Sequence, residues 1–221
     1  MSTRTTARRN RLQGGFSLII TLLALIIISF AAVALLRSTD TSTLIAGNLS
    51  FKKTALGASD AAVETAITFM NSNTGGGFLY LNQPASGYYA STAENCDLTG
   101  SSTPSNANDD VAWSNASPNG SCNMTALTVT PAGVPAGYAV SYVINRLCSA
   151  EGDPSAILAA DGLTTMTCSR VTGVVSDGST KTGGFYGNTP LSGSAQIYYR
   201  ITVRVTGPRN TVRYLQTFVT L

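Results

Sequence analysis

The sequence contains no histidine, and this absence excludes several kinds of enzyme chemistry. Without an imidazole there is no Ser-His-Asp triad, no Cys-His nucleophile pair and no zinc site with histidine ligands. The glycine-rich phosphate-binding and dinucleotide-binding patterns and the G-x-S-x-G pattern of hydrolases are missing as well. We therefore expect a protein that is not an enzyme and has no cofactor.

Charged residues are scarce, at 11% of the 221 residues, against roughly a quarter in an average globular chain. Four of the 14 basic residues lie among the first fifteen positions, namely Arg4, Arg8, Arg9 and Arg11. The rest of the chain then has ten basic against 11 acidic residues and is almost neutral. Because a near-neutral body does not attract polyanions at long range, we do not expect nucleic acid to be a partner.

One long apolar run, residues 16–36, has no charged side chain. As a helix it extends roughly 30 Å, which is enough to cross a bilayer. The arginines before it form the heavier basic flank, so we expect the N-terminus in the cytoplasm and the remainder outside the inner membrane. A cleaved secretory signal is the alternative, because small residues occur at positions 31–34.

The start of this run has an unusual junction, RLQGGFSLII at positions 11–20. A basic leader that ends in glycine before Phe-Ser-Leu-Ile resembles the cleavage site of type IV prepilins. The resemblance implies that a prepilin peptidase removes the leader 1–15 between Gly15 and Phe16, and that Phe16 is then N-methylated. Gly15 suits such a cut because it has no side chain to hinder an extended backbone. A generic single-pass anchor behind a basic tail is the alternative.

The sequence departs from the major pilins of this family at one position. Major pilins usually carry Glu at the fifth mature residue, where its carboxylate meets the amine of a neighbouring subunit, but here that residue is Ile20. A buried amine without a partner is costly. Ile20 therefore favours a minor subunit, at or near the filament tip, over a repeating shaft subunit.

Residues 37–70 contain no proline and are expected to continue the helix outside the membrane. Leu56, Val63, Ile67 and Met70 fall on one face of a 3.6-residue period and are predicted to be its buried face. The Ala-Gly-Asn at 46–48 and the alanine-rich stretch at 58–62 resemble the N-terminal region of PilX-type minor pilins. This resemblance covers about a quarter of the chain, residues 11–70.

Beyond the helix, residues 71–136 are rich in Gly, Ser, Asn and Thr and are expected to form a variable loop region, with one short strand at 126–130. Residues 137–221 alternate apolar and polar side chains as β-strands do. We expect strands at 137–148, 166–175, 197–205 and 211–220, the last two joined by a turn at 207–210.

Pairing the last two strands symmetrically about their turn sets Val205 opposite Val212 and Val203 opposite Tyr214. One face of this hairpin is then apolar and can cover the N-terminal helix. The other face gathers Arg200, Arg204 and Arg213, a candidate partner surface. A long N-terminal helix packed on a C-terminal antiparallel sheet, with a long loop-rich insertion, is an α+β, pilin-like fold.

The four cysteines occur only in the part expected to lie outside, at positions 96, 122, 148 and 168. An even number in an oxidising compartment predicts two disulfides. Three connectivities are open, and sequence proximity suggests Cys96 with Cys122 and Cys148 with Cys168. No C-x-x-C pair or histidine supports a metal site. The acidic residues Asp109, Asp110, Glu151, Asp153 and Asp161 also lack the spacing of a calcium loop, so no metal is expected.

Together these features predict a non-catalytic minor pilin that resembles PilX and contributes to a type IV pilus or primes its assembly. Expected partners are the inner membrane before assembly, then other minor and major pilins, the prepilin peptidase and a tip adhesin. The expected location is the inner membrane, with a periplasmic C-terminal domain, and then the extracellular pilus. A minor pseudopilin of a type II secretion system, related to GspK, is one alternative. A pilus-displayed adhesin or DNA-binding subunit and a simple tethered domain are the others.

Overall fold

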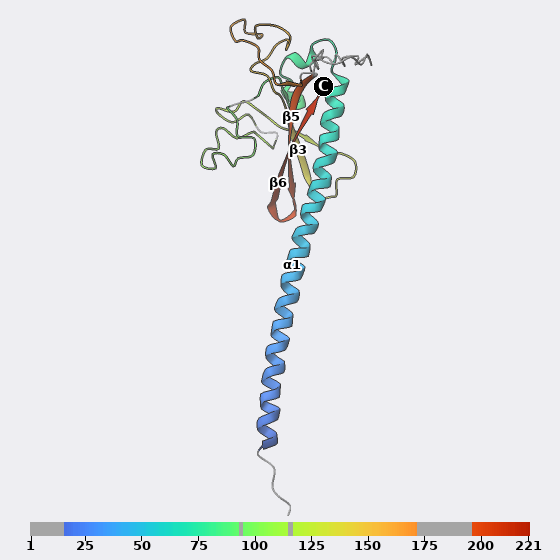
Figure 1. Cartoon of the computed structure of the whole chain (residues 1–221), viewed down its shortest axis with the longest axis vertical. Helices are drawn as coiled ribbons and strands as arrows, with labels where there is room; N and C mark the ends of the chain where they lie inside the picture. The colour runs from blue at the N-terminus through green and yellow to red at the C-terminus, as the bar shows by residue number, and fades with distance from the viewer. Residues whose placement is uncertain (1–15, 93–94, 115–116, 172–195) are drawn as a thin grey trace, which may run out of the picture. The chain divides into compact units, whose positions relative to one another are not determined.

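A computed structural model describes residues 16–92, 95–114, 117–171 and 196–221. The chain divides into two compact units, residues 1–50 and 51–221, which are considered separately. One helix, α1 (Phe16–Ser72), contributes to both units (Figure 1). The expected leader 1–15 with Gly15, and residues 172–175 of one expected strand, lie outside the described residues.

In the first unit, the described residues 16–50 are helical and exposed, apart from the partly buried Gly47. The apolar run at 16–36 has no proline or glycine, so nothing in its backbone opposes a helix. Two of its three hydroxyl groups bond to the preceding turn: Thr21 Oγ1 donates to Leu18 O at 2.9 Å, and Ser29 Oγ donates to Leu25 O at 2.8 Å. These bonds satisfy polar groups that an apolar environment could not.

In the second unit, the helix residues that pack on the sheet are mostly alanines. Ala62, Ala66 and Met70 are fully buried, and Ala55, Ala58 and Ser59 are nearly so. The prediction that Leu56 belongs to this face is wrong, because 53% of its surface is exposed. Val63 and Ile67 are only partly buried at the edge of the contact. Small side chains allow the helix backbone to approach the sheet closely, which a leucine would prevent.

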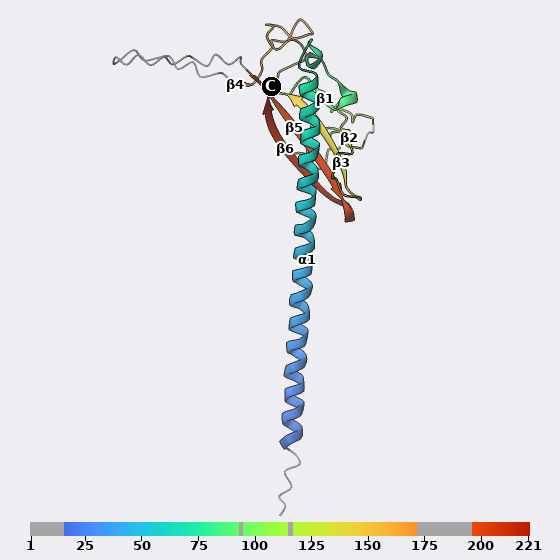
Figure 2. The ribbon, with the colours of Figure 1, turned by 90° about the vertical axis from the view of Figure 1, so that its right-hand side faces the viewer.

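The sheet has six strands, and its centre is antiparallel. Its strands are β1 (Tyr88–Tyr89), β2 (Leu127–Val129), β3 (Ala139–Arg146), β4 (Arg170–Val171), β5 (Gln196–Gly207) and β6 (Thr211–Thr220). β5 lies between β3 and β6 and pairs antiparallel with both, β4 pairs with the start of β5, and β2 pairs antiparallel with β3. Figure 2 shows these strands together with the C-terminal part of α1. Short 3₁₀ turns occupy Phe78–Tyr80, Pro84–Ser86 and Pro208–Asn210.

The sheet is mixed rather than purely antiparallel, because β1 pairs parallel with β3. This strand comes from the region expected to be loop. It can approach because Gly87, before β1, adopts a positive φ of 65°, and a Cβ there would lie 2.9 Å from the Tyr142 carbonyl oxygen. This close approach allows Ile144 N to donate to Gly87 O at 2.8 Å.

The register of β5 and β6 differs by one residue from the predicted pairing. Val205 lies opposite Arg213 and Val203 opposite Leu215. The loop has three residues, Pro208–Asn210, because Asn210 adopts a left-handed φ of 59° and lets Gly207 pair with Thr211. A one-residue shift exchanges the two faces of a strand. Leu215 and Val219 of β6 therefore face α1, and Tyr214 and Phe218 face away.

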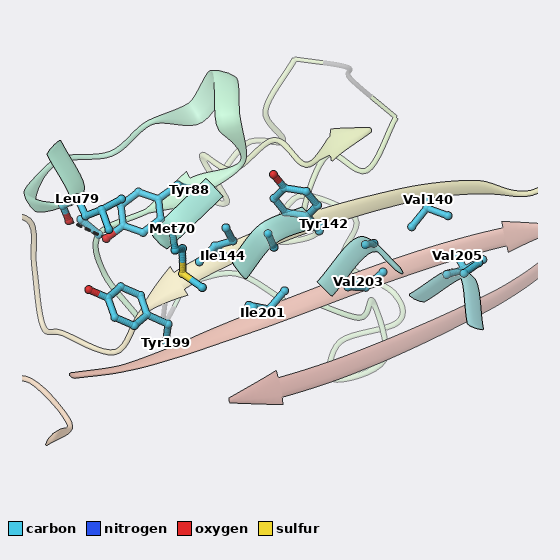
Figure 3. Packing of buried hydrophobic residues seen from close by; sticks show 14 of the residues in the cluster. Met70, Leu79, Tyr88, Val140, Tyr142, Ile144, Tyr199, Ile201, Val203 and Val205 are labelled. Carbon is cyan, nitrogen blue, oxygen red and sulfur yellow. Dashed lines mark hydrogen bonds between the residues drawn. The ribbon is translucent and has the colours of Figure 1, made fainter. Parts of the chain in front are cut away.

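The main core lies between α1 and the sheet. It contains Met70 of α1, Tyr88 of β1, the β3 residues Val140, Tyr142 and Ile144, and the β5 residues Tyr199, Ile201, Val203 and Val205 (Figure 3). The Tyr88 hydroxyl donates to Leu79 O at 2.6 Å, which satisfies the polar end of a fully buried ring. This packing explains the alternation of apolar residues along β3 and β5.

A second core lies on the opposite sheet face and is built from the region expected to be mostly loop. It contains Tyr89, Leu98, Val111, Trp113, Cys122, Met124, Ala126 and Val143. The sequence did not predict this core, because its apolar residues are far apart in a region of polar composition. They are brought together by the Cys96–Cys122 disulfide and by backbone bridges such as the one between Ala112 and Thr125.

Candidate functional site

The apolar start of α1 is the first candidate site. Among the described residues, α1 contains a segment that is long and apolar enough to cross a membrane, and none of this segment is buried in the protein. Phe16 begins the helix with 75% of its surface exposed, and the first turn has no acidic residue. Ile20 is 51% exposed. By length and composition this segment could span a bilayer.

The three arginines of the expected partner surface do not come together. The one-residue change of register places Arg213 on the α1 side of β6, where it borders a small apolar cavity with Lys52 and Leu56. Arg200 and Arg204 lie on the opposite face. The candidate partner surface is therefore wrong as a three-arginine cluster.

The two remaining arginines also have separate surroundings. Arg200 is partly buried, its Nη2 donates to Thr92 O at 2.7 Å, and burial lowers its pKa. Arg204 borders a cavity of about 310 Å³ with Asp110 and Tyr214. Each arginine is thus used locally, and together they do not form a continuous basic strip for a polyanion.

Two disulfides fasten the loops of the second unit. Cys96 is joined to Cys122 and Cys148 to Cys168, the pairing that sequence proximity suggested. The first bridge borders the second core, and Cys148 belongs to a third small cluster with Ala159 and Met166. No free cysteine is present. The four cysteines therefore have a structural role in this fold.

The loop after Cys96 is organised by one buried carboxylate. Asp97 Oδ1 accepts hydrogen bonds from Thr99 N and Gly100 N, and Oδ2 accepts from Ser102 N and Thr103 N, at 2.6–3.1 Å. Burial opposes ionisation of Asp97, but these four backbone donors outweigh it and lower its pKa. Burial, Asp97 and Asp109 all raise the pKa of the neighbouring Asp110.

The other acidic residues weighed as cation ligands also form local contacts. Asp153 accepts from Ser155, Asp161 accepts from Leu163 and Thr164, and Glu151 accepts from the backbone and side chain of Asn82. Within the described ranges, no group of three or more acidic or cysteine side chains has a geometry suited to a metal ion. Asp153 and Asp161 thus stabilise turns, and Glu151 holds Asn82 of a distant loop.

Sequence reasoning missed Arg146, a fully buried arginine at the end of β3. Its Nε donates to Ala90 O, its Nη1 to Leu79 O, and its Nη2 to Ala150 O and Gly152 O, at 2.8–3.2 Å. One side chain thereby joins three loops to the sheet. The sequence did indicate an unusual environment for this residue, since Arg146 is the one charged residue in the strand pattern at 137–148.

A polar cavity of about 320 Å³ lies beside the first disulfide. Its wall includes Asn82, Ser91, Asn95, Cys96, Asn123 and Ser149, from three separate loops. Nothing in the sequence indicated that these residues meet, because they belong to the region of least regular pattern.

The chain matches no protein-family model, and it shows no significant similarity to any curated protein or solved structure. The likeness to type IV prepilins therefore rests on the junction at Gly15 and Phe16, the apolar helix and the motifs up to residue 70.

Proposed function

We propose that this chain is a minor, non-catalytic, PilX-like subunit of a type IV pilus, held in the inner membrane before it enters the filament. The observation that carries the proposal is the apolar segment of α1, which begins at Phe16 and is wholly exposed. Such a helix is retained as an anchor when the leader is removed. The same surface then packs against equivalent helices of neighbouring subunits.

Transfer of the helix from lipid to a filament is feasible because both environments are apolar. Beyond the first turn, the main-chain groups of this segment bond within the helix, and Thr21 and Ser29 donate to its carbonyl oxygens. Apart from its first turn, which includes the Phe16 amine, the helix thus needs no polar partner in either place. Its packing partner in the filament is an apolar helix of another pilin.

Ile20 supports a minor role over a shaft role. In a shaft built of this subunit alone, the amine of Phe16 would be buried next to an isoleucine and not a carboxylate, which costs several kcal/mol per subunit. A subunit that primes the filament or lies at its tip does not make this contact with a copy of itself. We expect deletion of the gene to reduce the number of pili without changing the shaft.

The test is quantitative mass spectrometry of sheared filaments, with the variant Ile20→Glu and the matched control Ile19→Glu. We expect the wild-type chain at a small fraction of the major pilin. Ile20→Glu should increase that fraction, whereas Ile19→Glu should not, because its carboxylate is on a different side of the helix. A wild-type stoichiometry comparable to the major pilin contradicts the minor role.

A minor pseudopilin of a type II secretion system shares the leader, the anchor and the isoleucine. The two proposals differ in the phenotype of the deletion: loss of pili supports the pilus, and loss of enzyme secretion with pili intact supports the pseudopilin. If neither changes, the chain is a simple membrane-tethered domain and both proposals fail.

A further inference from the structure

The small apolar cavity at Arg213 lies between α1, β5 and β6, within the second unit. It is lined by the buried Ala55, Ser59 and Val205, together with Leu215 and the 53% exposed Leu56. The Ser59 hydroxyl is already used, since it donates to Leu56 O at 2.7 Å. The interior of the cavity is therefore suited to an aliphatic group and not to a polar one.

Two cations border this cavity. Lys52 of α1 and Arg213 of β6 both line it, and both are exposed. Neither side chain forms an ion pair or a hydrogen bond with another residue in the described part of the chain. Cations beside an apolar surface favour a partner that carries a carboxylate next to an apolar group.

The size of the cavity limits what can enter it. At about 130 Å³ it is smaller than the sites that hold whole small molecules, which begin at roughly 300 Å³. An apolar cavity of roughly 150 Å³ holds a group the size of benzene, so one leucine or isoleucine side chain fits here. The acyl chain of a lipid is too long to be enclosed. The size therefore favours a side chain of a protein.

From these observations we infer that the cavity is a docking site for a segment of a partner protein in which a leucine or isoleucine stands next to an acidic residue. The aliphatic side chain enters beside Leu56 and Leu215, and the carboxylate meets Lys52 and Arg213. Burial of the aliphatic group supplies most of the affinity, and the two cations select an acidic partner. The inference does not depend on leader cleavage or filament assembly, so it can fail while the proposed function holds.

The experiment is methyl NMR on the full chain in phosphatidylcholine nanodiscs, which contain no free detergent to fill the cavity. The probe is the peptide acetyl-Ala-Leu-Glu-Ala-amide, and the reporters are the methyl groups of Leu56, Val205 and Leu215. We expect these signals to shift on titration, with a dissociation constant in the millimolar range because one side chain is buried. The peptide with Ala in place of Leu should bind about tenfold more weakly, and the peptide with Gln in place of Glu about fivefold more weakly.

A charge-removing variant and a matched control test the role of the two cations. Lys52→Gln/Arg213→Gln should weaken binding of the glutamate peptide about fivefold and leave binding of the glutamine peptide unchanged. The control Lys53→Gln removes an exposed cation that does not line the cavity and that lies on another side of α1. It should not change the affinity for either peptide.

Three results would overturn the inference. One is the absence of shifts at the three reporter residues with the leucine-glutamate peptide. Another is equal affinity of the wild type and Lys52→Gln/Arg213→Gln for the glutamate peptide, since the cations would then select nothing. The third is that decanoate displaces the peptide from these methyl groups with higher affinity, since the occupant would then be a fatty acyl group and not a protein segment.

Discussion

The Nη2 atom of Arg146 donates a hydrogen bond of 2.8 Å to the carbonyl oxygen of Gly152, in a loop closed by the Cys148–Cys168 disulfide. The other acceptors of this guanidinium, Leu79 O, Ala90 O and Ala150 O, are also main-chain carbonyls. A buried cation is thus stabilised by peptide dipoles. The loops that carry these carbonyls are ordered around it.

Replacing Arg146 with methionine should lower the free energy of unfolding by about 3–5 kcal/mol, because Ala90 O, Ala150 O and Gly152 O lose the donor that Arg146 gives them and Leu79 O keeps only the Tyr88 hydroxyl. The measurement is urea unfolding followed by the fluorescence of Trp113, the single tryptophan. Arg213→Met is the matched control, and since Arg213 is exposed its effect should stay within about 0.5 kcal/mol. Equal effects of the two variants would refute the role of Arg146.

A second prediction concerns the alanine face of α1, which packs on the sheet. Ala62 is fully buried against the sheet, so Ala62→Leu should overpack the contact and cost about 1–3 kcal/mol of unfolding free energy. Leu56→Ala, on the exposed side, should have little effect. Both are measured by the same urea titration. If Leu56→Ala is the more damaging variant, the buried face is the one predicted from periodicity.

The sequence predicted the elements better than the faces they bury. The helix and the strands expected at 137–148, 197–205 and 211–220 follow from apolar periodicity and are present, whereas only residues 170–171 of the described part of the strand expected at 166–175 form a strand. The buried face of α1 did not follow, because a hydrophobicity pattern gives more weight to Leu56 than to Ala62. Close helix–sheet contact selects for small side chains, and this depends on the partner surface.

The register of the hairpin was beyond a sequence argument for a related reason. It depends on whether Gly207 belongs to the turn or to the strand, and Asn210 decides this through its left-handed backbone. The predicted register therefore placed Arg213 on the same face as Arg200 and Arg204, whereas it lies on the face toward α1. Similarly, the polar cavity is lined by residues of three loops that have no regular sequence pattern, so the sequence could not predict that these residues meet.

Stability should depend on pH through Asp97. Its folded pKa is lowered, so its contribution is present above the unfolded value of about 3.9 and is lost as the pH falls through the lower, folded value. The raised pKa of Asp110 acts in the opposite sense. Asp97→Asn should be less stable at pH 7 and lose less stability than the wild type as the pH falls below about 4.

Urea midpoints measured between pH 2 and 7 check this expectation. Asp60→Asn, an exposed position on α1, is the matched control and should follow the wild-type profile. A profile of Asp97→Asn parallel to that of the wild type would show that the four backbone donors do not stabilise the ionised carboxylate.

The disulfides give a direct chemical prediction. Peptide mapping without reduction should find Cys96 linked to Cys122, Cys148 linked to Cys168, and no free thiol. Replacing Cys148 and Cys168 together by serine should cost about 3 kcal/mol, since the loop of 20 residues is then free in the unfolded chain. A link between Cys96 and either Cys148 or Cys168 would refute the connectivity.

The central claim, that this is a prepilin-type subunit, is tested most directly by the N-terminus of the mature protein. Mass spectrometry of the chain from cells that contain the peptidase should find an N-methylated Phe16 as the first residue. Gly15→Leu should retain the leader, and Gln13→Ala should not. A mature chain that still begins at Met1, or one that begins after Ala34, would contradict the account.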